Sequence, residues 1–316
     1  MKIGAVFPGQ GSQTVGMGVD VASHSNVARG LFDRAAGVLG YDLLALQKDG
    51  PEERLRETKF SQPAIFTTNV ALYSAVGEGF RPVVSAGHSF AEFCSLYAAD
   101  SLSFEDALRI VNERAQAMQD AAELAVGGMS AVLGLDAETI RAVVERVRNE
   151  TGERVSLANF NSPTQIVISG DLNAVQIAGH ALSTAGAKRI VPLNVSGAWH
   201  SDLMEPALER FSAAVERGEF SIPQFDVISN VDAQPYRDVE TIKRNLVASI
   251  MSEVRWHATA ERLLSYQLDL VVEFGASGVL GPLMKRLPNS PPVLVVSDRS
   301  GIEKLRGMLA EDVVRA

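Results

Sequence analysis

The chain has 316 residues, of which 46% are hydrophobic and 21% charged, and it can therefore bury one large core and a second, smaller one, which excludes a disordered protein. Its 38 acidic and 29 basic side chains give a net charge of -9, which argues against binding to nucleic acid or to an anionic membrane. The single cysteine, Cys94, excludes internal disulfides and a cysteine-rich metal site.

The N-terminal apolar run, residues 3–7, is followed at once by Pro8 and Gly9 and is too short for a signal-peptide core. No apolar run approaches the roughly 20 residues that cross a bilayer. With only one cysteine, a reducing compartment is also suitable. We therefore expect a cytoplasmic protein, and a chain of this size fits a monomer.

Short apolar runs alternate with amphipathic segments, a pattern that predicts a parallel sheet covered by helices. The predicted strands are residues 3–7, 83–87, 225–229, 270–274 and 293–296. Between the first two strands, Ser61 is expected to cap a helix over residues 62–76, with Pro63 in its first turn. After the second strand, Ser103 and Asp106 resemble a capping box and predict a helix over residues 104–121.

The order of the predicted elements changes between Gly128 and Leu193. The elements there are a strand at 130–135, a helix at 137–148, strands at 155–158 and 165–170, a helix at 172–184 and a strand at 189–193. This βαββαβ order is that of a ferredoxin-like unit. With Gly127, Gly128 and Asn194 as hinge signals, we expect an α/β fold in which residues 128–193 are inserted into a larger domain of residues 1–127 and 194–316.

Residues 83–98 predict a strand, a sharp turn centred on Ser89 and a helix. This geometry exposes one hydroxyl at a helix N-terminus, as a nucleophile elbow does. An elbow needs small residues two positions before and two after the serine, and the chain has Gly87 and Ala91 there. A serine that caps a helix over residues 90–98 fits the same pattern, so this segment alone leaves both interpretations open.

The first strand is followed by a glycine-rich loop, residues 7–13. The loop lacks the Lys-Ser/Thr pair of a phosphate-binding P-loop, and Thr14 stands where a dinucleotide fingerprint has its third glycine. It can offer a free backbone N–H. In an acyl-transfer site, the amides of Gln10 and Phe90 would be the two donors to a developing oxyanion. A plain turn is the alternative.

His200 lies in a loop of small residues from which an imidazole can reach a neighbouring loop. We instead expect His24, His180 and His257 to be structural histidines of the surface or core. Arg114 lies in a helix, either solvated or turned inward to bind a carboxylate through two parallel hydrogen bonds, and spacing does not choose between these. Ser89 and His200 together suggest covalent acyl transfer.

Several segments occur in a distinctive order: Pro8-Gly9-Gln10-Gly11-Ser12-Gln13, Ser61-Gln62-Pro63-Ala64, Gly87-His88-Ser89 with Glu92, Arg114 with Met118-Gln119, Asn161-Ser162-Pro163 with Gln165, His200-Ser201, and Glu273-Phe274-Gly275 with Val279-Leu280. As a set they resemble the malonyl-CoA:acyl carrier protein transacylases, including the free-standing acyltransferases of polyketide pathways. The resemblance covers nearly the whole chain.

The resemblance implies an α/β-hydrolase-like large domain with a ferredoxin-like insertion. It implies that Ser89 is the nucleophile and His200 the general base, that the amides of Gln10 and Phe90 form the oxyanion hole, and that Arg114 binds the malonyl carboxylate. It also places four more residues in the substrate site: Gln62, His88, Asn161 and Trp199. The implied partners are malonyl-CoA and an acyl carrier protein, with no metal and no cofactor beyond the CoA thioester that is the substrate.

The chain departs from the family pattern at a few positions. Ser249 stands where the family usually has a glutamine whose backbone carbonyl orients the histidine, and because a carbonyl survives a side-chain change, the role is expected to persist. Phe90-Ala91 replace a common Leu-Gly pair, and Ala115 replaces a frequent glycine. These changes bear on acyl preference and speed, while Trp199 is typical of malonyl-selective members.

Other functions stay open. A transacylase of different acyl specificity in a polyketide pathway, or an acyl hydrolase, would use the same Ser89 and His200, the hydrolase giving the acyl group to water. A hydrolase for neutral acyl chains has no use for a buried Arg114. A non-catalytic relative that only binds carrier proteins is disfavoured because both Ser89 and His200 are present.

Overall fold

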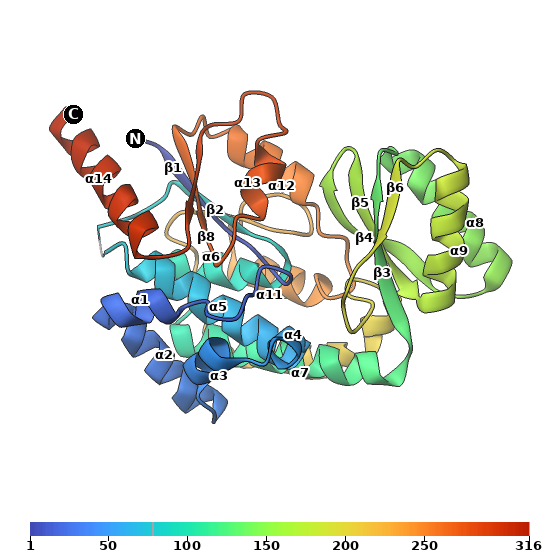
Figure 1. Ribbon diagram of the computed structural model, residues 1–316, viewed down its shortest axis with the longest axis horizontal. Coiled ribbons are helices and arrows are strands. Elements are labelled where there is room, and N and C mark those ends of the chain that lie inside the picture. The colour runs from blue at the N-terminus through green and yellow to red at the C-terminus, as the bar shows by residue number, and fades with distance from the viewer. Residues whose placement is uncertain (78, 316) are drawn as a thin grey trace.

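The computed structural model describes residues 1–77 and 79–315, which form two sheets with helices around them (Figure 1). The strands are β1 (Ile3–Phe7), β2 (Val84–Gly87), β3 (Gly127–Leu133), β4 (Val155–Ser162), β5 (Gln165–Asp171), β6 (Arg189–Pro192), β7 (Asp226–Ile228), β8 (Leu270–Phe274) and β9 (Val293–Val296). The α-helices are α1 (Val19–His24), α2 (Asn26–Leu39), α3 (Leu43–Asp49), α4 (Glu52–Arg56), α5 (Thr58–Ser74), α6 (Glu92–Ala98), α7 (Phe104–Leu124), α8 (Ala137–Thr151), α9 (Leu172–Thr184), α10 (Leu208–Arg217), α11 (Val239–Ala248), α12 (Trp256–Leu264), α13 (Leu280–Met284) and α14 (Arg299–Arg315). Two short 3₁₀ segments are η1 (Ser89–Ala91) and η2 (Asp202–Ala207).

The larger sheet has the strand order β7-β2-β1-β8-β9, and every neighbouring pair is parallel. Its strands are the five predicted from the sequence, each within one residue at either end. The predicted α/β class with a parallel sheet is therefore confirmed.

Side chains of the larger sheet alternate between two apolar cores, because successive residues of a strand point to opposite faces. Ile3, Ala5 and Phe7 of β1 enter one core, which also takes side chains of α5, α6 and α7. Val6 enters a second core, formed with α12 and α13 on the other face. Helices thus bury both faces, which explains why the strands read as unbroken apolar runs.

The smaller sheet has the order β4-β5-β3-β6, and all its pairs are antiparallel. The elements from β3 to β6 follow the predicted order of strand, helix, strand, strand, helix, strand. Helices α8 and α9 pack on one face through a separate core (Figure 1). Met129, Ala131 and Val167 on the other face join the large core, so the two sheets share one apolar boundary.

Two local predictions need correction. Helix α5 begins at Thr58, so Ser61 lies inside it rather than at its N-cap, and Pro63 follows in the helix interior. Gly127 and Gly128 are residues of β3 and not a hinge before it. The cap of α7 is confirmed, because Ser103 Oγ accepts the Asp106 N–H at 3.1 Å.

Parallel pairing brings the carboxyl ends of β1, β2, β7 and β8 to one edge of the larger sheet. In open α/β sheets this edge is where ligands bind, because the loops that leave it converge. Residues 8–13 follow β1, Ser89 follows β2 and Asn230 follows β7. Among the residues that the structure describes, no helix is both long and apolar enough to cross a membrane.

Candidate active site

The site is built around a contact between two distant residues: Ser89 Oγ lies 2.7 Å from His200 Nε2. Both residues have left-handed backbone, with φ of 56° for Ser89 and 59° for His200. Each such residue costs about 1–3 kcal/mol and persists only where its surroundings hold it. Because Ser89 lies in η1 and α6 begins at Glu92, its alternative interpretation as the N-cap of a helix over residues 90–98 is wrong.

The turn at Ser89 is tight enough to require glycine at two neighbouring positions. A Cβ on Gly87 would lie 1.9 Å from the Ala91 carbonyl oxygen, so no larger residue fits there. A Cβ on Gly9 would lie 2.6 Å from the His88 carbonyl oxygen. The loop after β1 can therefore pass directly against the serine turn, and the methyl group of Ala91 is accommodated in the core.

Backbone carbonyls determine which nitrogen of His200 carries the proton. Nδ1 lies 2.8 Å from the Ser249 carbonyl oxygen and 3.1 Å from that of Ser252. A carbonyl only accepts, so Nδ1 carries the hydrogen and donates it. In the neutral ring, Nε2 then keeps its lone pair and accepts the Ser89 hydroxyl hydrogen, the arrangement that a general base requires.

Arg114 is only 1% exposed, so its interpretation as a solvated surface residue is wrong. Its guanidinium donates to Gln62 Oε1 at 2.8 Å and to Ser89 Oγ at 3.4 Å. Its Nε has no hydrogen-bond partner, and within the described part of the chain no carboxylate forms a salt bridge with it. A buried cation whose partners are neutral is suited to bind an anion.

These groups open into a cleft of about 290 Å³ between the edge of the larger sheet and the smaller sheet. The predicted site residues that line the cleft are Gln10, Gln62, His88, Ser89, Arg114, Trp199 and His200. Asn161 does not line it. Its Oδ1 instead accepts the His88 Nε2 hydrogen at 3.0 Å, which ties the serine turn to β4, and Ser249 stands behind His200.

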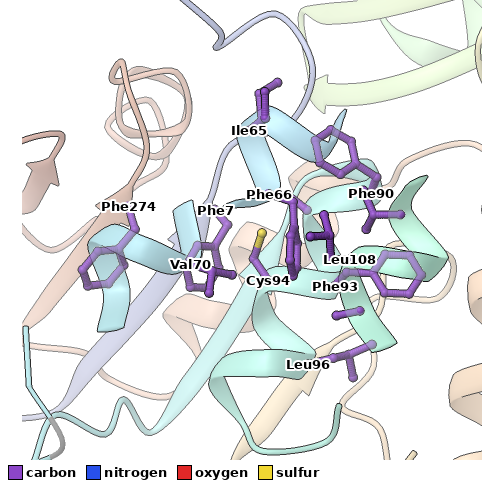
Figure 2. Close-up of a cluster of buried hydrophobic side chains, with 14 of the residues drawn as sticks. Phe7, Ile65, Phe66, Val70, Phe90, Phe93, Cys94, Leu96, Leu108 and Phe274 are labelled. Carbon is purple, nitrogen blue, oxygen red and sulfur yellow. The ribbon is translucent and has the colours of Figure 1, made fainter. Parts of the chain in front are cut away.

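The amides predicted to face an oxyanion are those of Gln10 and Phe90. In the residues covered by the structure, neither N–H donates to another protein group, whereas the neighbouring amides of Ser12 and Ala91 bond to Gly9 and His88. The Phe90 side chain is buried in the cluster that also contains Phe66, Phe93 and Leu108 (Figure 2). Its ring anchors the turn while its backbone N–H stays available.

Comparison with known proteins gives one consistent result. The family model described as acyl transferase domain matches residues 5–285. The malonyl CoA-acyl carrier protein transacylase of Bacillus subtilis (strain 168) is 38% identical over 312 residues, or 98% of both chains. The chain belongs to the malonyl-CoA:acyl carrier protein transacylase family. It is accordingly an acyltransferase.

Solved structures of this family have the same fold. An acyl carrier protein S-malonyltransferase from Vibrio cholerae superposes with a TM-score of 0.92 at 38% identity, covering 96% of this chain and 100% of that one. A malonyl-transacylase solved in complex with its type II polyketide synthase acyl-carrier protein gives 0.93 at 38% identity, covering 98% of this chain and all of the other.

In this transacylase family member, burial keeps His200 neutral. Desolvation, together with a smaller effect of the positive charge of Arg114, lowers the pKa of His200 from 6.5 to about 3. Burial also lowers the pKa of Arg114 to about 9, which still leaves the guanidinium protonated at neutral pH. The cleft therefore holds a free base and a fixed cation side by side.

Several residues of the site were not identified from the sequence. Asn159 of β4 lines the cleft, the Ser252 carbonyl is a second acceptor for His200, and Asn230 hydrogen-bonds to the Ser89 turn. Glu92 was recognised only as part of the segment around Ser89, with no role predicted for it. A signal that Asn230 belongs to the site was available, since it directly follows the strand predicted at residues 225–229.

The pH dependence of stability tests the buried, neutral state of His200. The folded chain leaves this ring unprotonated down to about pH 3, whereas the unfolded chain protonates it from about pH 6.5. Stability should therefore fall as the pH drops through this window. His200→Gln should reduce the slope by up to about 1.4 kcal/mol per pH unit.

Urea unfolding of both proteins at a series of pH values measures the two slopes. Burial also lowers the pKa of His88, so the slope of the variant should not reach zero. Equal slopes for the two proteins would contradict a neutral His200.

Proposed function

We propose that the enzyme transfers a malonyl group from malonyl-CoA to the phosphopantetheine thiol of an acyl carrier protein through an ester on Ser89. The observation that carries this proposal is the 2.7 Å contact between Ser89 Oγ and His200 Nε2, with a buried Arg114 guanidinium 3.4 Å from the same oxygen. The relatives' names add the acyl group and the carrier protein.

In the first half-reaction, Ser89 Oγ attacks the thioester carbon and His200 Nε2 takes the hydroxyl proton. The carbonyl oxygen becomes an oxyanion, which accepts hydrogen bonds from the amides of Gln10 and Phe90. When the C–S bond breaks, His200 gives the proton to the sulfur and CoA leaves as a thiol. Ser89 then carries the malonyl ester.

In the second half-reaction, the thiol of the carrier protein takes the place of CoA. His200 removes the thiol proton as the sulfur attacks the ester carbon, and the oxyanion forms again between the same two amides. The ester C–O bond breaks, and His200 returns the proton to Ser89 Oγ. This chemistry draws on neither a metal nor a redox cofactor.

Arg114 supplies selectivity for an acyl group with a free carboxylate. Its unpaired Nε and its neutral hydrogen-bond partners leave the guanidinium without a carboxylate in direct contact, and a substrate carboxylate could bind it through two parallel hydrogen bonds. Gln62 holds the guanidinium in place. An enzyme that hydrolyses esters of neutral acyl chains would bear the desolvation cost of this cation without using it.

Several finer predictions belong to the same proposal. We propose that residues 128–193 are an inserted ferredoxin-like domain and that residues 1–127 and 194–316 form the α/β-hydrolase-like domain; the two separate sheets support this division. A monomeric state and a cytoplasmic location remain predictions.

Ser89→Ala should abolish the covalent adduct, because it removes the attacking oxygen. Intact-mass spectrometry after incubation with malonyl-CoA should detect a malonyl-enzyme for the wild type and none for the variant. Ser23→Ala, on α1 at an exposed position, should behave like the wild type. An adduct on the Ser89→Ala variant would refute the assignment of Ser89 as the nucleophile.

Addition of a carrier protein to the malonyl-enzyme tests the second half-reaction. The malonyl mass should move to the carrier protein, whereas release as free malonate would identify a hydrolase.

Arg114→Ala should slow malonyl loading roughly 10- to 100-fold more than acetyl loading, because only malonate carries a carboxylate for the guanidinium. The ratio of single-turnover rates with malonyl-CoA and acetyl-CoA measures this effect. Arg109→Ala is the matched control, since Arg109 lies on the same helix but is exposed and pairs with Asp106. An equal fall in the rate with both thioesters would show that Arg114 does not determine selectivity for malonyl-CoA.

A further inference from the structure

The turn at Ser89 is held by one side chain from another part of the chain, that of Asn230. Asn230 Oδ1 accepts the Ser89 N–H at 3.0 Å, and its Nδ2 donates to the carbonyl oxygens of Gly87 at 3.0 Å and Ser89 at 3.3 Å. Asn230 is 1% exposed and lies two residues after the end of β7, separated from it by the buried Ser229. A left-handed, non-glycine turn thus has both its donor and its acceptors satisfied by a single amide.

Glu92 fixes the orientation of that amide. Its Oε2 accepts hydrogen bonds from the Asn230 backbone N–H at 3.1 Å and from Nδ2. Its Oε1 accepts the Tyr236 hydroxyl hydrogen. Since Nδ2 faces two carbonyls and a carboxylate, and Oδ1 faces an N–H, the reverse orientation would oppose oxygen to oxygen at three contacts. The amide therefore has one favourable arrangement.

We propose that Asn230 is a positioning residue, which holds the Ser89 turn so that Oγ is aimed at His200 Nε2. Asn230 hydrogen-bonds to the Ser89 N–H and to two carbonyl oxygens of the turn. The N–H of Phe90 therefore remains free to donate to the acyl oxygen. Asn230 acts through Ser89 and does not touch the substrate. The inference rests on the proposed function for its catalytic meaning, while the geometry of the turn is independent of which acyl group is carried.

Asn245 offers a matched control. It is also a buried asparagine, 6% exposed, and its Nδ2 donates to Ser229 Oγ at 3.2 Å and Asp232 Oδ2 at 3.0 Å. It therefore supports the same loop after β7, and within the described part of the chain its side chain hydrogen-bonds to that loop and not to the serine turn. Loss of either side chain should destabilise this region, and only loss of Asn230 should misplace Ser89.

The test measures the rate at which Ser89 is labelled in the full chain by two probes, malonyl-CoA and a fluorophosphonate, which reacts with activated serines and carries no carboxylate. For Asn230→Ala we expect both rates to fall roughly 10²-fold, because a misplaced nucleophile slows every acylation. The malonyl-CoA concentration that gives half the maximal rate should change by less than about threefold, since Arg114 is untouched.

Asn245→Ala should keep both labelling rates within about threefold of the wild type, even where its melting temperature falls as much as that of Asn230→Ala. The proposal is overturned if Asn230→Ala labels at the wild-type rate, if Asn245→Ala is slowed equally, or if the loss lies in half-saturation alone. A wild-type chain labelled by fluorophosphonate but not by malonyl-CoA would refute the proposed substrate and leave the positioning role to be read from the fluorophosphonate rates.

Asn230→Asp keeps the shape of the side chain and provides the test if the alanine variant does not fold. An aspartate can accept the Ser89 N–H but repels the two carbonyls and Glu92, whereas its protonated form regains a donor. Its labelling rate relative to the wild type should therefore recover as the pH is lowered from about 8 to about 5.5. A ratio that stays constant across this range would contradict the positioning role.

Discussion

The hydrogen bond between Ser89 Oγ and His200 Nε2 connects residues that lie 111 positions apart, and the rest of the site depends on it. Both residues have left-handed backbone and are held from behind. Asn230 binds the serine turn, and the carbonyls of Ser249 and Ser252 accept the Nδ1 hydrogen of His200. The positions of the hydroxyl and the ring are thus fixed before a substrate arrives, so that little reorganisation is left for the reaction itself.

Burial is the second constraint, and it acts in opposite ways on two neighbouring groups. It keeps His200 neutral, as a general base must be. It also surrounds the Arg114 guanidinium, which has no carboxylate partner, and this favours binding of a substrate anion. The two groups are coupled, because the charge of Arg114 lowers the pKa of His200. An anion bound to Arg114 would weaken that effect, so a malonyl group would make His200 a stronger base at the moment when it is needed.

Features carried by local patterns could be predicted from the sequence. The strands of the larger sheet were found because buried runs are bounded by turn residues, and the Ser89 turn because Gly87 permits a close approach that no other residue allows. The predicted cap at Ser61 was wrong because α5 begins three residues earlier, at Thr58. The position of Asn230 after a predicted strand indicated that it belongs to the site, but its contacts and those of Glu92 could not be predicted, since the partners lie about 140 residues away and only the fold brings them together.

The protonation state of His200 is the most direct test of this account, and ¹⁵N NMR of the imidazole rings measures it. The neutral ring should carry its hydrogen on Nδ1, with Nε2 showing the shift of an unprotonated nitrogen that accepts a hydrogen bond, from about pH 8 down to about pH 5. On substitution of Ser89 by alanine, the Nε2 signal alone should move. A ring that is protonated at neutral pH, or one with its hydrogen on Nε2, would contradict the proposed role of His200 as the base.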